Sequence, residues 1–165
     1  MKLSLGTASD ADALLIAALR TAAAERLTRD YGRGHWSSCA TEAGVLRAIK
    51  TSRVLVARDR GHVVGTLTLA KKKPWAIDVS YFRGVRKALY LLDMAVDPEV
   101  QRKGIGRRLV REAMTIAREW PSDAIRLDAY DADAGAGPFY AKCGFHEVGR
   151  VTYRKTPLVY FELLL

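Results

Sequence analysis

The chain alternates between segments whose apolar residues recur at helical spacing and short apolar runs typical of strands. Helical spacing predicts a first helix after Ser9, a second over about 41–50 and a third over 104–120. A short fourth helix is expected over 137–143, because Gly144 follows it as a helix-ending residue. In the first helix the apolar positions at this spacing are Leu14, Leu15, Ala18, Leu19, Ala22 and Ala23. We expect that stripe to face the core.

Apolar runs between turn residues predict the strands. Residues 53–58 and 63–69 flank a Gly-containing turn and form a hairpin. Residues 88–96 are a continuous apolar run with one carboxylate, which is typical of a central strand buried on both faces. The remaining strands are expected over 124–131, 145–153 and 158–164. Helices and strands that alternate in this way predict an α/β or α+β fold.

One long segment has no clean period. Residues 71–87 are basic and aromatic, and we expect an irregular loop with at most one helical turn. Long loops in compact domains are frequently functional.

Length and composition limit the class of protein. The 165 residues predict a single domain over 1–165, and 49% apolar with 27% charged residues is ordinary for a globular chain. No apolar run is long enough to span a membrane, and residues 1–12 lack the apolar core of a signal peptide. Cys39 and Cys143 do not make a disulfide framework. We therefore expect a cytoplasmic protein with reduced thiols and no membrane partner.

The charge balance points to an anionic partner. Lys and Arg total 27 against 18 Asp and Glu, a formal net charge of +9. Such an excess suits a phosphorylated small molecule or nucleic acid, and Lys71, Lys72 and Lys73 fit the second. No recognition-helix or RNA-binding pattern accompanies them, so nucleic acid is the less favoured partner.

The most informative segment joins the strand that ends at Val96 to the third helix. Gly104 and Gly106 lie where that helix begins, and Arg102, Lys103 and Arg107 add positive charge. Free backbone amides at a helix start bind anions, and glycine lets a ligand approach the backbone.

The familiar nucleotide-binding and calcium-binding motifs do not fit this part of the chain. A dinucleotide-binding fingerprint needs a third glycine where Leu109 stands, and a P-loop needs Gly-Lys-Ser/Thr where Gly106-Arg107-Arg108 stands. The acidic residues Asp128, Asp131 and Asp133 do not have the spacing of a calcium loop, and we expect no metal site.

Two motifs together resemble the GNAT superfamily of N-acetyltransferases. Gln101-x-x-Gly104-x-Gly106, after the strand end 93–98, is similar to motif A of that family. The segment Phe139–Phe145, with a tyrosine four residues before Gly-Phe, is similar to motif B. With the preceding helices and hairpin, the resemblance covers nearly the whole chain.

The resemblance implies a fold and a cofactor. The fold would be a mixed, mostly antiparallel sheet of six or seven strands with about four helices. Strands 88–96 and 124–131 would run parallel and splay apart at their C-terminal ends. The cofactor would be acetyl-CoA, with its pantetheine on one strand edge and its diphosphate on the glycine loop. The implied cofactor-binding residues are Met94, Ala95, Val96, Gln101, Arg102, Lys103, Gly104, Ile105, Gly106, Arg107, Asp133 and Lys142. Asp133 stands where the family often has asparagine, and a carboxylate there can accept but not donate a hydrogen bond.

The resemblance also implies catalytic roles. Tyr140 takes the position of a tyrosine that protonates the departing thiolate; the alternative is a tyrosine that only packs. The attacking amine must lose a proton, and Asp93 and Asp128 are the candidate bases, with His35 as a third. A carboxylate on an apolar strand is expected to have a raised pKa, which suits a base.

The acceptor is expected to be a small-molecule amine. Tyr31, His35 and Trp36 lie in the loop after the first helix, and Trp75 and Tyr81 lie in 71–87. A peptide N-terminus also suits such aromatic and cationic residues. A non-catalytic module that binds acyl-CoA or nucleic acid is the other alternative. The apolar C-terminus 161–165 is a candidate homodimer interface.

Overall fold

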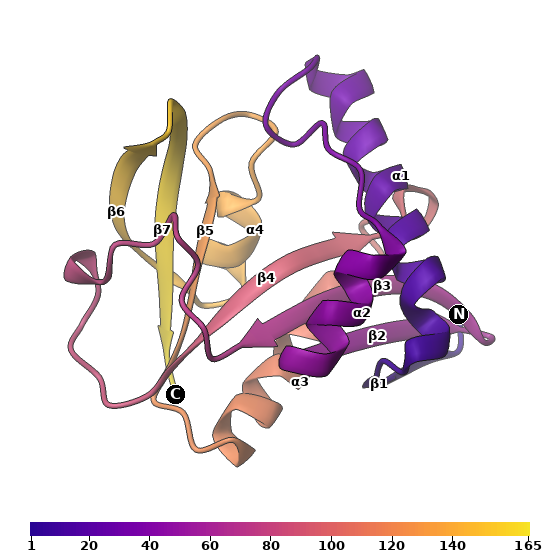
Figure 1. The fold of residues 1–165 in the computed structure, drawn as a ribbon, viewed down its shortest axis with the longest axis horizontal. Coiled ribbons are helices and arrows are strands. Elements are labelled where there is room, and N and C mark those ends of the chain that lie inside the picture. Colours follow the sequence, from indigo (N-terminus) through magenta and orange to yellow (C-terminus); the bar gives the residue numbers. More distant parts are fainter. The chain divides into compact units, whose positions relative to one another are not determined.

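The computed structural model describes all 165 residues (Figure 1). The strands are β1 (Leu3–Thr7), β2 (Arg53–Asp59), β3 (His62–Ala70), β4 (Ala88–Val96), β5 (Ala124–Tyr130), β6 (His146–Tyr153) and β7 (Thr156–Leu164). The α-helices are α1 (Ala13–Tyr31), α2 (Glu42–Thr51), α3 (Ile105–Glu119) and α4 (Gly137–Lys142). Short 3-10 helices are η1 (Asp10–Asp12), η2 (Val79–Tyr81) and η3 (Pro98–Val100). None of the helices is long and apolar enough to cross a bilayer.

The seven strands follow the order β1-β2-β3-β4-β5-β7-β6. β4 and β5 pair in parallel, and the pairs β1–β2, β2–β3, β5–β7 and β6–β7 are antiparallel. This confirms the predicted α+β class, with a mixed and mostly antiparallel sheet. The parallel register runs from Ala88 opposite Ala124 to Tyr90 opposite Arg126. The predicted splay of the strand ends stays a prediction.

The chain divides into two compact units. Unit 1 comprises Met1–Ala70 and Leu92–Ala113, and unit 2 comprises Lys71–Leu91 and Met114–Leu165. Both β4 and α3 have residues in each unit. The single functional domain expected from the length therefore stays a prediction.

Unit 1 is built on the antiparallel strands β1, β2 and β3. Its core cluster combines Ala8, which directly follows β1, with residues of α1, α2 and β2, namely Ala13, Ile16, Ala17, Val45, Val54 and Val56. Strand β1 was not predicted, because its five residues, LSLGT, lack an apolar run. The predicted hairpin is confirmed, and its turn uses left-handed backbone at Arg60 and Gly61.

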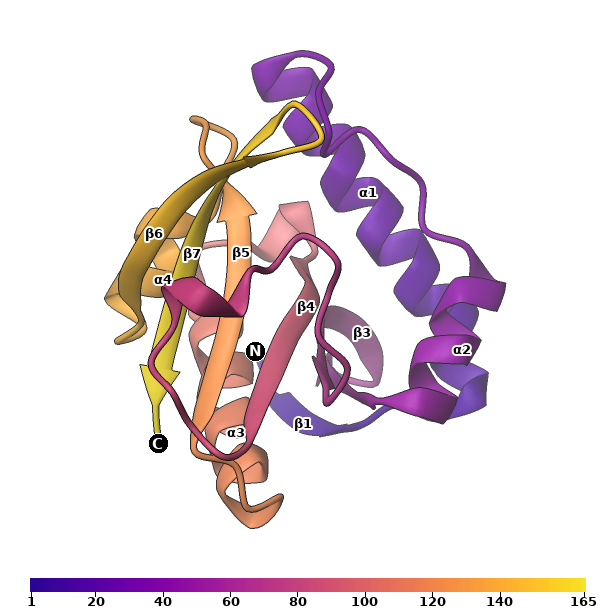
Figure 2. The same cartoon turned by 60° about the vertical axis from the view of Figure 1, so that its left-hand side comes forward.

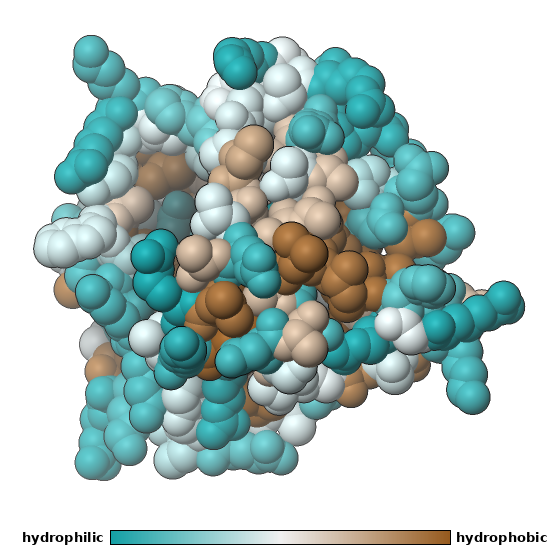
Figure 3. Space-filling view, turned by 45° about the vertical axis from the view of Figure 1, so that its right-hand side comes forward, coloured by the Kyte–Doolittle hydropathy of each residue, from teal (hydrophilic) through white to brown (hydrophobic).

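Helix α1 presents a different face to the core from the predicted stripe. Leu14 and Leu15 are 61% and 54% exposed, whereas Ile16 and Ala17 are buried. Of the predicted stripe only Leu19 is buried. The two exposed leucines leave apolar surface on α1. On the face drawn in Figure 3, hydrophobic side chains lie among hydrophilic ones.

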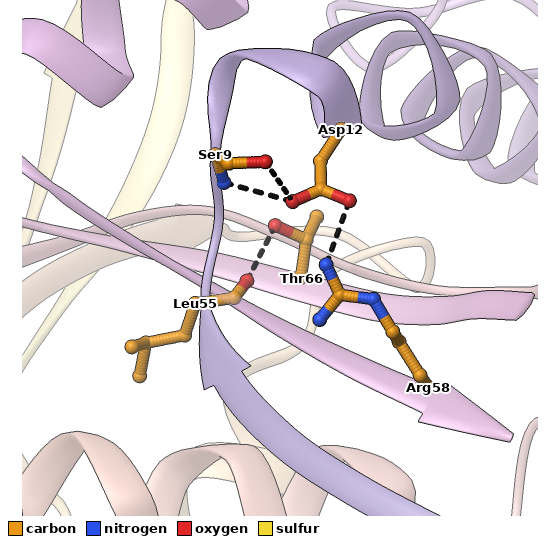
Figure 4. Close-up of polar contacts among 5 residues, drawn as sticks. All are labelled: Ser9, Asp12, Leu55, Arg58 and Thr66. Atoms are coloured by element: carbon orange, nitrogen blue, oxygen red, sulfur yellow. Dashed lines mark hydrogen bonds and ion pairs between the residues drawn. The ribbon is translucent and has the colours of Figure 1, made fainter. Parts of the chain in front are cut away.

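A polar network fixes the start of α1 (Figure 4). The Asp12 carboxylate accepts hydrogen bonds from the Ser9 amide (2.8 Å) and hydroxyl (3.2 Å) and pairs with Arg58 of β2 (2.7 Å). Burial acts to raise the pKa of Asp12, but the Ser9 and Arg58 contacts outweigh it and hold that pKa below its usual value. Nearby, the Thr66 hydroxyl donates to the Leu55 carbonyl and ties β3 to β2. The network therefore anchors α1 to the sheet of unit 1.

Unit 2 is built on β5, β7 and β6, which lie side by side in Figure 2 with part of 71–87 crossing them. The segment 71–87 is mostly irregular and contains η2, as predicted. Ile77 and Phe82 of this segment form a buried cluster with Tyr90 and Tyr160. The Tyr160 hydroxyl donates to the Ala76 carbonyl and accepts from the Asp78 amide (3.1 Å). The segment is therefore pinned to the sheet of unit 2.

The C-terminal strand, β7, contributes buried apolar side chains to the core of unit 2. Phe161 and Leu163 are 4% and 9% exposed, and only Leu164 among the large apolar residues there is well exposed, at 44%. β7 lies between β5 and β6, so most of this apolar surface is covered within the chain. Most of these side chains are therefore unavailable to a partner copy, and the homodimer interface over 161–165 stays a prediction.

Candidate active site

The predicted anion-binding loop lies between β4 and α3 in unit 1. Asp97 caps η3 by accepting from the Glu99 amide (2.9 Å), and the Gln101 side chain donates to the Val96 carbonyl (3.1 Å). Arg102 and Gly104 both have left-handed backbone, with φ of 64° and 82°. This sharp turn reverses the chain directly into the first turn of α3.

Residues 101–104 are exposed, whereas Ile105 is only 1% exposed and anchors the helix start. Ile105 and Leu109 approach Gly65 of β3 so closely that a Cβ there would lie 3.0 and 2.9 Å from them. The first turn of α3 is thus held in place while its amide end stays open. Free amides with Arg102, Lys103 and Arg107 around them fit the diphosphate of coenzyme A.

Gly104→Ala tests this loop. The φ of 82° is costly for alanine by about 1–2 kcal/mol, although nothing lies within 4 Å of the added Cβ. We expect the turn to shift and the Kd for acetyl-CoA to rise about tenfold, a change that is about 1.4 kcal/mol of binding energy. Isothermal titration calorimetry measures it.

Gly61→Ala is the matched control, because Gly61 has φ of 89° and equally open space in the β2–β3 turn. Its strain is the same, and its acetyl-CoA affinity should stay at the wild-type value. Equal losses in both variants would show a stability effect and contradict the diphosphate role.

Asp93 does not lie where a buried base was expected. It is exposed, has left-handed backbone with φ of 54°, and pairs with Arg20 of α1 at 2.7 Å. The expectation of a carboxylate buried in an apolar strand is therefore wrong at this position. β4 is fully buried only over 89–91, and Met94, Ala95 and Val96 are half-buried. No signal in the sequence singled out Arg20, which lies 73 residues away.

The aromatic residues after α1 form a compact loop in unit 1. The Trp36 indole donates to the Gly32 carbonyl (3.0 Å), and its ring covers Gly34, where a Cβ would lie 2.5 Å from it. Tyr31 is 51% exposed, and His35 is also exposed. Trp36 therefore shapes the loop. Tyr31 and His35 are the more exposed of the three acceptor-binding candidates in this loop.

Tyr140 is buried on α4 in unit 2. Its ring packs against Phe139, Phe145 and Phe161, with centroid distances of 5.3, 5.7 and 6.3 Å. Burial raises the pKa of the Tyr140 phenol well above its usual value, and Cys143 and Asp128 add to the shift. The hydroxyl therefore carries its proton throughout the neutral range.

Asp128 is the solvent-shielded carboxylate that the sequence predicted on this strand. It lies half-buried on β5 opposite Tyr160 of β7, and loss of solvent raises its pKa, partly offset by its own backbone amide. The same carboxylate contributes to the raised pKa of Tyr130, Tyr140 and Tyr160, after burial in each case. Asp128 is thus electrostatically coupled to three phenols, and this group of four side chains is the cluster around Asp128. Tyr160 was not predicted, because only the register between β5 and β7 places it opposite Asp128. Tyr130 was missed, although it lies two residues along the same strand and could have been found from strand alternation.

The other predicted residues of unit 2 are more exposed. Asp133 and Lys142 both lie at the surface. Trp75 is 83% exposed, whereas Tyr81 is 44% exposed and contacts Tyr160 edge-on at 5.5 Å. Tyr81 thus belongs to the aromatic cluster that pins 71–87, and Trp75 does not.

Comparison with known proteins assigns the family. The sequence model of the acetyltransferase (GNAT) family matches residues 20–145. Glucosamine 6-phosphate N-acetyltransferase of Schizosaccharomyces pombe is 32% identical over 88 residues, which cover 53% of this chain and 71% of that protein.

Solved structures share the fold. The protein yncA of Salmonella typhimurium, whose structure contains its cofactor acetyl-CoA, has a TM-score of 0.76 at 19% identity and covers 100% of this chain and 95% of its own. Ribosomal-protein-alanine N-acetyltransferase of Brucella melitensis has a TM-score of 0.76 at 20% identity, with coverage of 98% and 99%.

A mixed sheet with a glycine-containing loop at the exposed start of α3 is typical of proteins that bind a phosphorylated ligand. With the family match over most of its length, the chain belongs to the acetyltransferase (GNAT) family. It is an acetyl-CoA-dependent N-acetyltransferase.

Proposed function

We propose that this protein transfers the acetyl group of acetyl-CoA to a primary amine of a small molecule by direct attack, with Tyr140 as general acid. The observation that carries the proposal is the buried, protonated Tyr140 phenol with the Asp128 carboxylate in electrostatic reach. When bound, acetyl-CoA supplies a thioester as the acetyl donor. The residues of this chain bind and orient the acetyl-CoA and the acceptor, and they transfer the protons.

Binding is assigned to two segments of unit 1. The amides of 101–106, with Arg102 and Lys103, hold the diphosphate, and Met94–Val96 offers backbone groups to the pantetheine amides. Asp133 and Lys142 of unit 2 are assigned as weaker cofactor contacts, because both side chains are exposed to solvent.

Asp128 is the better candidate base of the two carboxylates. Its raised pKa lets it take a proton from the ammonium of the acceptor, whereas Asp93 is engaged by Arg20. Tyr140 delivers a proton to the leaving sulfur. An ordinary thiol has a pKa near 8.5, below that of a buried phenol, so this donation is uphill unless Tyr140 is reprotonated as it donates. An ammonium acceptor loses two protons as the amide forms: Asp128 takes the first before attack and releases it to solvent, and the second leaves the nitrogen after attack and restores the proton that Tyr140 gave to the sulfur. The net reaction therefore releases one proton and returns both side chains to their starting state.

Asp128→Asn removes the charge of a carboxylate that is shielded from solvent, so it tests the effect of that charge on catalysis and on stability. We expect kcat/KM at pH 7 to fall about 100-fold, because the base is lost. We expect the variant to be more stable than the wild type at pH 7. A raised folded-state pKa means that ionised Asp128 costs stability once the pH rises through that pKa.

Below the ordinary aspartate pKa of 3.8 both side chains are neutral, and the two stabilities should converge. Urea unfolding at pH 7 and in acid measures this difference. A variant that is less stable at pH 7 would show that ionised Asp128 is favourably partnered, and would contradict its role as a base with a raised pKa.

A small-molecule acceptor is favoured by the relative at 32% identity, which is named for a small phosphorylated amine. Structural neighbours named for ribosomal-protein alanine are only 20% identical or less. The exposed Tyr31 and His35 in unit 1 are the acceptor-binding candidates there. Of the two predicted in unit 2, Trp75 is the more exposed candidate, whereas the Tyr81 ring packs against Tyr160.

A panel of amines read by release of free thiol tests the proposal. It should contain amino sugars and their 6-phosphates, polyamines, free amino acids, and peptides that begin with alanine. Turnover of a small amine, with a peptide rate at least about tenfold lower, is expected. Turnover confined to peptides would overturn the acceptor class. Acetyl-CoA binding without any turnover would favour the non-catalytic alternative.

A further inference from the structure

A pocket of ≈ 370 Å³ opens on unit 2. Its lining residues are Tyr81, Arg83, His146, Val148, Glu162 and Leu164. Neither Tyr140 nor Asp128 lines it, so it is separate from the proposed proton-transfer groups. Its volume is at the small end of the range for pockets that hold small ligands.

The base of the pocket is a carboxylate held in one orientation. Glu162 is 5% exposed, and its two oxygens accept from the Arg126 Nε (2.9 Å) and the Arg83 amide (3.3 Å). Arg126 in turn donates to the Arg83 carbonyl (2.5 Å) and lies over the Phe82 ring at 4.9 Å. A carboxylate has about four acceptor positions, and these contacts use two. Glu162 therefore retains capacity to accept from a donor inside the pocket.

The rim carries two side chains with no partner in the chain. Arg83 and His146 are exposed and form no side-chain hydrogen bond or ion pair. A free guanidinium matches the two oxygens of a carboxylate. Because Arg126 already neutralises Glu162, the unpaired charge of the pocket is the positive charge of Arg83.

The remaining walls are apolar. Val148 and Leu164 contribute aliphatic surface, and Tyr81 contributes a ring. That ring is fixed, because it contacts Tyr160 edge-on and fills the space above Gly149, where a Cβ would lie 2.2 Å from it. An apolar group that enters the pocket meets a preformed surface.

We propose that this pocket binds a free α-amino acid with an apolar side chain. The α-carboxylate pairs with Arg83, the α-ammonium donates to Glu162, and the side chain lies on Tyr81, Val148 and Leu164. Glu162 lies two residues, or about 7 Å, from Tyr160 along β7, and Tyr160 is the register partner of Asp128. The pocket thus adjoins the proposed proton-transfer groups without including them. We assign the amino acid as a ligand distinct from the acetyl acceptor, because neither Tyr140 nor Asp128 lines the pocket.

NMR titration of the 15N-labelled full chain without acetyl-CoA tests this. L-leucine is the probe, and isoamylamine and 4-methylpentanoate are the matched analogues that lack the carboxylate or the amine. We expect leucine to give saturable shifts at the amides of Arg83, His146 and Val148. Each analogue should bind about tenfold more weakly, because each loses one hydrogen-bonded charge.

Arg83→Gln should weaken leucine binding about tenfold. Arg86→Gln is the matched control, because Arg86 is exposed on the same segment but does not line the pocket. Glu162 is avoided as a test position, because its loss endangers the fold. Three outcomes would overturn the proposal: no saturable shifts, shifts that survive Arg83→Gln, or 4-methylpentanoate binding as tightly as leucine.

Discussion

Tyr140→Phe is expected to lower kcat about 100- to 1,000-fold while the Kd for acetyl-CoA stays within about twofold. The change removes one oxygen and keeps the ring that packs against Phe139, Phe145 and Phe161. The lost group is a phenol that burial keeps protonated, so the loss should fall on proton delivery to the leaving sulfur. Steady-state thiol release with the best amine of the panel, and calorimetry with acetyl-CoA, measure the two quantities.

Tyr153→Phe is the matched control, since Tyr153 is half-buried on β6 and outside the cluster around Asp128. It should keep the wild-type kcat. Thermal unfolding of both variants excludes a folding defect. If Tyr140→Phe retains the full rate while folded, Tyr140 serves only to pack α4, and the acid role is wrong.

Arg126→Met is expected to lower the free energy of unfolding by about 3–5 kcal/mol. The side chains of Arg126 and Glu162 are 7% and 6% exposed, and their N–O distance is 2.9 Å. Removing the arginine leaves a buried carboxylate without its cation and frees the Arg83 carbonyl that Arg126 also binds. Urea denaturation at pH 7 measures the loss.

Two comparisons sharpen this result. Arg26→Met breaks an exposed pair with Asp30 and should leave the unfolding midpoint nearly unchanged, because solvent screens such pairs. The double variant Arg126→Met with Glu162→Leu should recover much of the lost stability, since no charge remains buried. A single variant as stable as the wild type would show that water reaches Glu162 and that the pair is not a buried one.

Much of the fold follows from local pattern. The run 88–96, the stripe of α3 and the turn at Arg60-Gly61 each predict one structure, because their periodicity or turn residues are unambiguous. The face of α1 was not predictable in this way. Its first seven residues, ALLIAAL, are all apolar and span about two turns, so the spacing is helical but has no unique phase. Packing against β2 and α2 selects Ile16 and Ala17 over Leu14 and Leu15.

The candidate site likewise has a part that the sequence predicts and a part that it does not. The glycine loop at 101–106 and the segment around Tyr140 can be found from the sequence, because each is contiguous and its residues act through their own backbone or ring. The pairing and the solvent exposure of the carboxylates cannot be found from the sequence. Asp93 and Asp128 both lie on apolar strands, but one pairs with Arg20 at the surface and the other is shielded from solvent near three phenols.

The sequence alone determined the four α-helices, six of the seven strands, the family and the candidate anion-binding loop, since these depend on neighbours a few residues apart. Only the tertiary structure decided which carboxylate is available as a base, which face of α1 is covered, and that Glu162 and Arg83 share a pocket. Those partners lie between 36 and 79 residues apart along the chain. Electrostatic and packing energies depend on distance in space, which the order of residues does not state.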